Sequence, residues 1–151
     1  MIKMGKIIRR GTVALSAVLL LFMSALILIS CGQKKKLAYY ADTDNYITVT
    51  GTVSYAKLSE DASSLYLAFD DMSLQLSDNC FKVVGNNLKS LQKELGDNTL
   101  KVGDQIEFVT APKYFGDGYV MPIVAMKRDG VELLSFDDGV RELIVWLRLE
   151  K

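Results

Sequence analysis

Histidine is absent from this chain of 151 residues, which removes the commonest general base at neutral pH and the commonest metal ligand. The sequence also lacks Gly-x-Ser-x-Gly, a phosphate-binding P-loop and Cys-x-x-Cys, the patterns of nucleophilic, nucleotide and redox chemistry. Adjacent aspartates occur at Asp70-Asp71 and Asp137-Asp138, but both pairs fall in predicted turns, where Asp bonds to nearby backbone. We therefore expect a protein that is not an enzyme and that carries no metal ion or cofactor.

A second absence is charge: residues 11–29 contain no charged side chain. The ten residues before them carry only basic charges, at Lys3, Lys6, Arg9 and Arg10. A basic flank followed by an apolar core is typical of a secretory signal peptide, and Lys and Arg stay on the cytoplasmic side. We predict that residues 1–30 are an export signal. The alternative is an uncleaved membrane anchor, because a spanning helix needs roughly 17–25 residues.

The apolar run ends in Leu28-Ile29-Ser30-Cys31, followed by Gly32. This segment resembles the lipobox of bacterial lipoproteins at each of its positions. The resemblance implies cleavage after Ser30 and attachment of a diacylglycerol to the Cys31 sulfur, with fatty acids such as palmitate. Two or more acyl chains anchor a protein stably to the bilayer. The basic residues 34–36 then either attract anionic headgroups or act as a solubilising spacer.

Cysteine is scarce, with only Cys31 and Cys80 in the chain. If Cys31 is lipidated, Cys80 has no partner for an intrachain disulfide, and we expect it to be a buried small apolar residue rather than a reactive or intermolecular thiol. Cleavage would leave 121 of the 151 residues and remove four basic side chains, so 14 basic residues would face 18 acidic ones, a net charge of −4. A mildly acidic domain is a poor partner for nucleic acid.

Residues 31–45 show no apolar periodicity, and we predict a flexible tether there, followed by a single domain over residues 46–151. Alternating apolar residues predict strands in that domain, with 73–76 and 80–84 forming either one broken strand or two. Gly51 predicts a bend or a close backbone approach, and Pro122 predicts an edge or a bulge. The predicted strands are 46–55, 64–69, 73–76, 80–84, 105–110, 119–126 and 131–136.

Two segments have helical periodicity. In the first, Asn86 or Asn87 is expected to cap a helix that runs to Gly96, with leucines at helical spacing between them. The second has acidic residues at its start and basic residues at its end, which predicts a C-terminal amphipathic helix whose stripe faces the core beside Trp146. The stripe residues are Val140, Leu143, Ile144 and Leu147.

The order of three strands, a helix and two more strands matches the five-stranded Greek-key OB barrel. Within it, Val102-Gly103-Asp104 resembles the Gly-Asp turn of bacterial OB families such as the tRNA-anticodon-binding-like domains. We predict a mainly β fold, namely an OB-like barrel with one helix between strands three and four, extended by a C-terminal strand and helix. The alternative is a small α+β sheet domain.

OB barrels bind ligands on the face of strands two and three and through the loops between strands one and two and strands four and five. In this sequence those loops are residues 57–64 and 113–118, and the candidate binding residues are Lys113, Tyr114, Phe115 and Tyr66. Exposed aromatic side chains supply contact area for a protein or a sugar ring. The alternative is that Tyr114 and Phe115 fold back as a hydrophobic plug.

Together these features predict a protein held on the extracytoplasmic face of the cell membrane by acylated Cys31. We expect its domain to be a non-catalytic binding module for a protein or peptide partner of the cell envelope. The alternatives are a module that binds cell-wall glycan and an accessory lipoprotein without a ligand. Nucleic acid is not an expected partner, because the mature chain is acidic and exported.

Overall fold

The computed structural model describes residues 32–114 and 119–149, so the predictions made for Cys31 and Phe115 fall outside the described residues. Contacts divide the chain into two units, residues 1–38 and 39–151. In the first unit, the described residues are helical; in the second, residues 39–41 are helical and the ordered elements follow. These elements are η1 (Thr43–Asn45), β1 (Ile47–Leu58), β2 (Ser64–Asp70), β3 (Phe81–Val84), α2 (Gly85–Leu95), β4 (Gln105–Thr110), β5 (Met121–Arg128), β6 (Val131–Leu134) and α3 (Phe136–Leu149).

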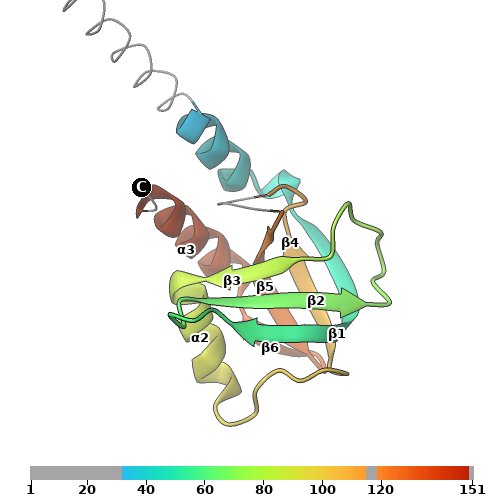
Figure 1. Ribbon diagram of the computed structural model, residues 1–151. Coiled ribbons are helices and arrows are strands. Elements are labelled where there is room, and N and C mark those ends of the chain that lie inside the picture. Colours follow the sequence, from blue (N-terminus) through green and yellow to red (C-terminus); the bar gives the residue numbers. More distant parts are fainter. Residues whose placement is uncertain (1–31, 115–118, 150–151) are drawn as a thin grey trace, which may run out of the picture. The chain divides into compact units, whose positions relative to one another are not determined.

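Six strands of the second unit form one sheet in the order β3-β2-β1-β4-β5-β6, and each of these neighbouring pairs is antiparallel (Figure 1). In addition, β3 pairs with β5 in parallel, which joins the two ends of the run β3-β2-β1-β4-β5. These five strands therefore ring a common interior, and β6 extends the sheet beyond β5. The result is an α+β fold in which α2 lies between β3 and β4, as the sequence predicts.

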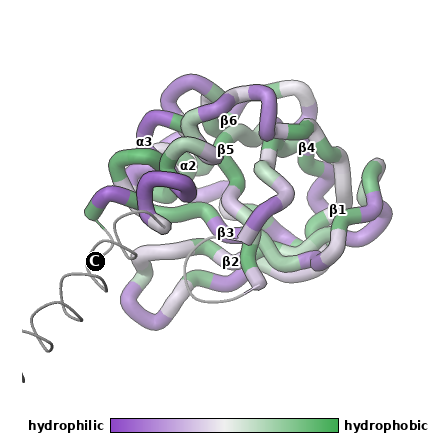
Figure 2. Tube along the Cα trace, turned by 90° about the horizontal axis from the view of Figure 1, so that it is seen from above, coloured by the Kyte–Doolittle hydropathy of each residue, from purple (hydrophilic) through white to green (hydrophobic). Residues whose placement is uncertain are grey.

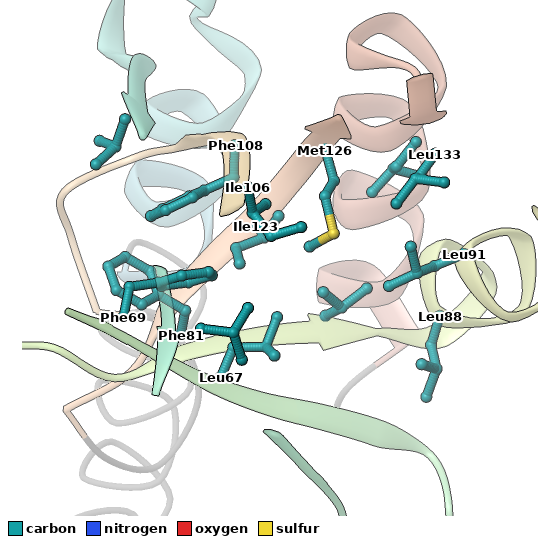
Figure 3. Packing of buried hydrophobic residues seen from close by; sticks show 14 of the residues in the cluster. Leu67, Phe69, Phe81, Leu88, Leu91, Ile106, Phe108, Ile123, Met126 and Leu133 are labelled. Carbon is teal, nitrogen blue, oxygen red and sulfur yellow. The ribbon is translucent and has the colours of Figure 1, made fainter. Parts of the chain in front are cut away.

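The interior of the ring is filled by aromatic and aliphatic side chains. Phe69 from β2 stacks on Phe108 from β4 at 4.3 Å between ring centroids, and Phe81 from β3 meets both rings edge-on. Leu88 and Leu91 from α2 join this cluster (Figure 3). Hydrophobic residues follow β4 and β5 in Figure 2, while hydrophilic ones collect in the connections. Burial of this apolar surface is the main force that holds the strands together.

Gly51 allows β1 to pack closely against the end of β2, which decides between the two predictions for this residue. A Cβ there would lie 2.9 Å from Phe69 Cβ and 3.3 Å from the Asp70 carbonyl oxygen, closer than side chains tolerate. The β1–β2 register then shifts between Val53 and Tyr55, which marks an irregularity in the ladder. A close approach, rather than a bend alone, therefore explains the glycine.

The strand predicted at residues 73–76 is wrong. The chain leaves β2 at Asp71, which has a positive φ of 52°, and Leu74 is exposed rather than paired. Only β3 returns beside β2, and the side chain of Asn79 extends that pairing by one step. Asn79 Oδ1 accepts from the Phe69 backbone N–H at 2.8 Å, and Nδ2 donates to the Phe69 carbonyl at 2.6 Å. A side chain thus satisfies backbone groups that a strand would otherwise pair.

The predicted caps of α2 are also wrong. The helix begins at Gly85, and both asparagines turn toward α3 instead. Asn86 Nδ2 donates to Glu142 at 2.8 Å, and the buried Asn87 Nδ2 donates to the Gly139 carbonyl at 2.8 Å. The two asparagine side chains that the sequence pattern assigns to a helix cap therefore join α2 to α3.

The predicted tether has regular structure in the part that is described, since residues 32–41 are helical. Tyr40 is fully buried, and removing its large apolar ring from water stabilises the folded state. Two carbonyls of the last helical turn accept hydrogen bonds from side chains that follow. Asn45 Nδ2 donates to the Tyr39 carbonyl at 2.9 Å, and the Tyr46 hydroxyl donates to the Tyr40 carbonyl at 2.8 Å.

Candidate functional site

The connection between β4 and β5 holds two of the predicted binding residues, Lys113 and Tyr114. The Tyr114 hydroxyl donates a hydrogen bond to the Asp78 carboxylate and lies 3.3 Å from Ser77 Oγ. The carboxylate acceptor keeps the proton on the phenol and so raises the pKa of Tyr114. These bonds join the loop after β4 to the connection before β3.

Tyr114 is not a hydrophobic plug: 36% of its surface is exposed. Its ring meets the ring of Tyr119 edge-on at 5.3 Å between centroids, and Tyr119 is 74% exposed. Two tyrosines therefore stand in contact with each other at the surface. The loop between them, which includes the predicted Phe115, lies outside the described residues.

Lys113 contributes to the packing of the domain as well as to its surface. Its Nζ lies 4.2 Å from the centroid of the Tyr39 ring, within the range of a cation–π contact, and its carbonyl accepts from the Tyr40 hydroxyl at 2.9 Å. Tyr46 also packs edge-on against Phe136 at the start of α3, 5.4 Å between centroids. The segment that enters the domain is thus joined directly to the loop that carries Tyr114.

Tyr66, the remaining predicted residue, lies on β2 away from that loop. The ammonium group of Lys82 on β3 is 5.2 Å from the Tyr66 ring centroid and 5.7 Å from that of Trp146 on α3. Trp146 in turn lies against Gly85, where a Cβ would be 3.0 Å from the indole ring. As the sequence predicts, Trp146 joins α3 to the sheet. In addition, Lys82 lies between the Trp146 ring and the Tyr66 ring, which the sequence did not predict.

The register of the strands shows that this group continues across β1. Lys57 pairs with Tyr66, and Tyr66 pairs with Lys82. Directly paired residues of antiparallel strands point to the same face, so the three side chains form one row across β1, β2 and β3. With Trp146 beyond Lys82, this cation–aromatic row (Lys57, Tyr66, Lys82, Trp146) alternates charge and ring.

The described residues provide other hollows but no group of three or more side chains suited to bind a metal ion. A pocket of about 350 Å³ lies over β1, β4 and β5, and it contains an ion pair of 3.2 Å between Lys127 Nζ and Glu107 Oε1. Cys80 is a free thiol, half-buried rather than buried as predicted, because it precedes β3 in an exposed connection. Burial, and to a lesser extent the charge of Asp78, raise its pKa.

Besides Lys57, which begins the predicted loop 57–64, four residues of these two surfaces are not among the sequence-based candidates: Asp78, Tyr119, Lys82 and Trp146. Tyr119 begins the predicted strand 119–126, and Asp78 lies between the predicted strands 73–76 and 80–84. Lys82 alternates with apolar neighbours in its strand, which places it on the outer face, but its partner ring on α3 is 64 positions away in the sequence. A periodic sequence pattern relates only residues that are close in the chain, so it cannot predict a contact over that separation.

Among the residues that the structure describes, no helix is long and apolar enough to cross a membrane. No protein-family model, no curated protein and no solved structure matches this chain.

Proposed function

We propose that this protein is a lipoprotein, anchored by acylated Cys31 on the extracytoplasmic face of the membrane, whose domain binds a protein or peptide partner of the cell envelope. The lipobox Leu28-Ile29-Ser30-Cys31 and the basic, then apolar, stretch before it support the anchor. The segment from Tyr39 to Tyr46, which packs into the domain, follows the proposed anchor within 15 residues of Cys31. Such a short connection would keep the domain close to the membrane.

We also propose that the domain is an OB-like barrel. Two features support this: the ring β1-β2-β3-β5-β4 contains a single parallel pair, β3 with β5, and α2 lies between β3 and β4. The Gly103-Asp104 turn contributes as well. The Gly103 N–H donates to the Val53 carbonyl and the Val53 N–H donates to the Asp104 carbonyl, each at 2.8 Å, so that the turn continues the β1–β4 contact. In such barrels the loop between strands four and five is a common binding element.

The observation that carries the binding role is the exposed pair Tyr114–Tyr119 in that loop. Tyr and Trp are enriched at the centres of protein interfaces, because they bring a large contact area at a low cost in side-chain entropy. The bond from Tyr114 to Asp78 orders the pair before a partner arrives, which lowers the entropic cost of binding.

A second candidate is a glycan-binding module, favoured by one detail of the same loop. Asp78 lies beside the Tyr114 ring, and a carboxylate next to an exposed aromatic ring suits a sugar, whose hydroxyls donate to the acid while its apolar face stacks on the ring. A protein remains the first candidate, since one Asp78 oxygen already accepts from Tyr114.

The binding role is tested by placing a photo-crosslinking amino acid at position 119 of the full chain in intact cells. The matched control has the same group at Val102, which is 71% exposed and precedes β4. A discrete protein adduct from position 119 that is absent from position 102, and that is lost with Tyr114→Ala, supports a protein partner. An adduct that is destroyed by muramidase identifies glycan instead, and identical patterns from both positions contradict a binding loop.

The anchor is tested separately by Cys31→Ala with metabolic labelling by a palmitate analogue. We expect loss of label and accumulation of an unprocessed precursor of lower mobility. Cys80→Ala is the matched control and should label as the unaltered chain does. Normal processing of the Cys31→Ala chain would contradict lipidation.

A further inference from the structure

We infer that the cation–aromatic row is a second docking surface, one that takes an acidic, extended segment of a protein partner. The inference rests on the proposed function only in that the partner is a protein. The row lies on the outer face of β1, β2 and β3, and the loop of Tyr114 and Tyr119 is not part of it.

The lysines of the row are not neutralised within the part of the chain that is described. Neither Lys57 nor Lys82 forms an ion pair with a described carboxylate. In the loop between β1 and β2, the Asp61 carboxylate accepts from the Ser59 hydroxyl at 2.6 Å and from the Ser63 hydroxyl at 2.8 Å. The face therefore presents two ammonium groups whose counter-ion must come from outside.

The aromatic rings hold one of these charges in place. Lys82 lies between the Tyr66 and Trp146 rings, and the quadrupole of each ring attracts the ammonium group without removing its charge. Tyr66 is half-buried between the two lysines and leaves apolar surface between them. A ligand that matches the row has an anion, then an apolar group, then a second anion.

The spacing of the row suits an extended peptide. Lys57 and Lys82 belong to strands on either side of β2, and neighbouring strands lie about 4.8 Å apart, so their backbones are about 10 Å apart. Three residues of a polyproline II segment span about 9 Å, and because this conformation has three residues per turn, residues i and i+3 face the same side. Carboxylates three residues apart would reach both lysines, and an intervening side chain would cover Tyr66.

Charge elsewhere on the domain favours a short acidic segment over a long polyanion. With 14 basic and 18 acidic residues after Ser30, the mature chain has a net charge of −4. A continuous polyanion would meet repulsion beyond the row, whereas a local acidic segment pairs with the two lysines alone.

The test uses the intrinsic fluorescence of Trp146, the one tryptophan of the chain, in the full protein in neutral detergent at low salt. The probe is a nonapeptide of three Glu-Ser-Leu repeats, and its neutral match has Gln in place of Glu. We expect a saturable change with the Glu peptide that weakens about threefold with Lys57→Gln and about tenfold with Lys57→Gln and Lys82→Gln together. Lys93→Gln, on the exposed face of α2, is the matched control and should leave the dissociation constant unchanged.

Three results would overturn the inference: equal affinity for the Gln peptide, unchanged affinity in the Lys57→Gln chain, or tighter binding of linear polyphosphate than of the Glu peptide. Lys57 is exposed, and its side chain forms no ion pair with a described residue, so its variant separates binding from folding. The crosslink from position 119 is scored in parallel. An adduct without peptide binding refutes the docking row alone, and peptide binding without an adduct refutes the binding loop alone.

Discussion

Gly139 lets α3 lie directly on the backbone of β5, and replacing it with Ala provides the sharpest test of the packing. A Cβ at this position would be 1.6 Å from the Val124 carbonyl oxygen, whereas such contacts are essentially never shorter than 3.0 Å. The helix must therefore move by at least 1.4 Å, the difference between these two distances. Because the obstacle is backbone, no change of rotamer relieves it.

The movement has two energetic consequences. Overpacking at a well-packed site costs about 1–3 kcal/mol. The hydrogen bond from the buried Asn87 Nδ2 to the Gly139 carbonyl would also be lost, and a buried polar group without a partner costs about 1–3 kcal/mol. Ala is a better helix former than Gly by about 1 kcal/mol, which offsets part of the loss. We expect Gly139→Ala to lower the free energy of unfolding by about 3 kcal/mol.

Thermal unfolding of the full chain in neutral detergent, followed by circular dichroism, measures this effect. A loss of about 3 kcal/mol corresponds to a fall in Tm of roughly 10 °C or more for a domain of this size. Gly32→Ala is the matched control, since Gly32 is helical and a Cβ there meets nothing within 4 Å. Val124→Ala should not rescue the Gly139→Ala chain, because trimming the side chain leaves the carbonyl in place. A Tm within about 2 °C of the unaltered protein would refute the reasoning.

Three further predictions concern single contacts. Asn79→Ala removes both bonds to the Phe69 backbone, so we expect a loss of about 1–3 kcal/mol and faster hydrogen exchange at the Phe69 amide; Asn98→Ala, an exposed asparagine, is the control, and unchanged exchange at Phe69 would contradict the assigned role. Burial raises the pKa of Tyr40 and of Tyr46 above the ordinary 10.0, so the unfolded chain releases these protons first, and stability should hold below pH 10 and fall as the pH rises beyond it. Tyr40→Phe with Tyr46→Phe should flatten that alkaline fall, and an equally steep fall would contradict the assignment. Asp104→Asn removes the charge that pairs with Arg128 at 3.3 Å, and we expect a loss of about 1 kcal/mol in thermal unfolding. Because the two side chains are only 25% and 15% exposed, most of that loss should persist in 1 M salt, and its disappearance in salt would contradict a half-buried pair.

Sequence periodicity predicted most of the elements, because side-chain burial alternates with the geometry of the backbone itself. The strands β1, β2, β4 and β5 and the two helices that begin at Gly85 and Phe136 lie where alternation and helical spacing place them, with shifts at their ends. The strand at residues 73–76 is the exception. Its alternating pattern is local, whereas pairing needs a free neighbour, and Asn79 and β3 already occupy the edge of β2.

Burial in the N-terminal segment also depended on the tertiary structure. Residues 31–45 are polar on average, so composition predicts a tether, yet one ring, that of Tyr40, is fully buried and its hydroxyl bonds to Lys113. The ring of Tyr40 and two side-chain bonds to the carbonyls of Tyr39 and Tyr40 attach this segment to the domain. The mean polarity of residues 31–45 does not predict these individual contacts.

The sequence by itself determined which reactive side chains are available, because the absence of histidine does not depend on folding. It also contains Leu28-Ile29-Ser30-Cys31, a linear pattern that predicts lipidation, and it indicated four aromatic or basic residues as candidates for binding. Only the tertiary structure decided which of them meet. Tyr114 pairs with Tyr119 across a loop, and Tyr66 shares Lys82 with Trp146 of α3, because ring closure by β3 and β5 brings distant segments to one surface. Contacts of that kind follow from the closing of the sheet, which no local pattern encodes.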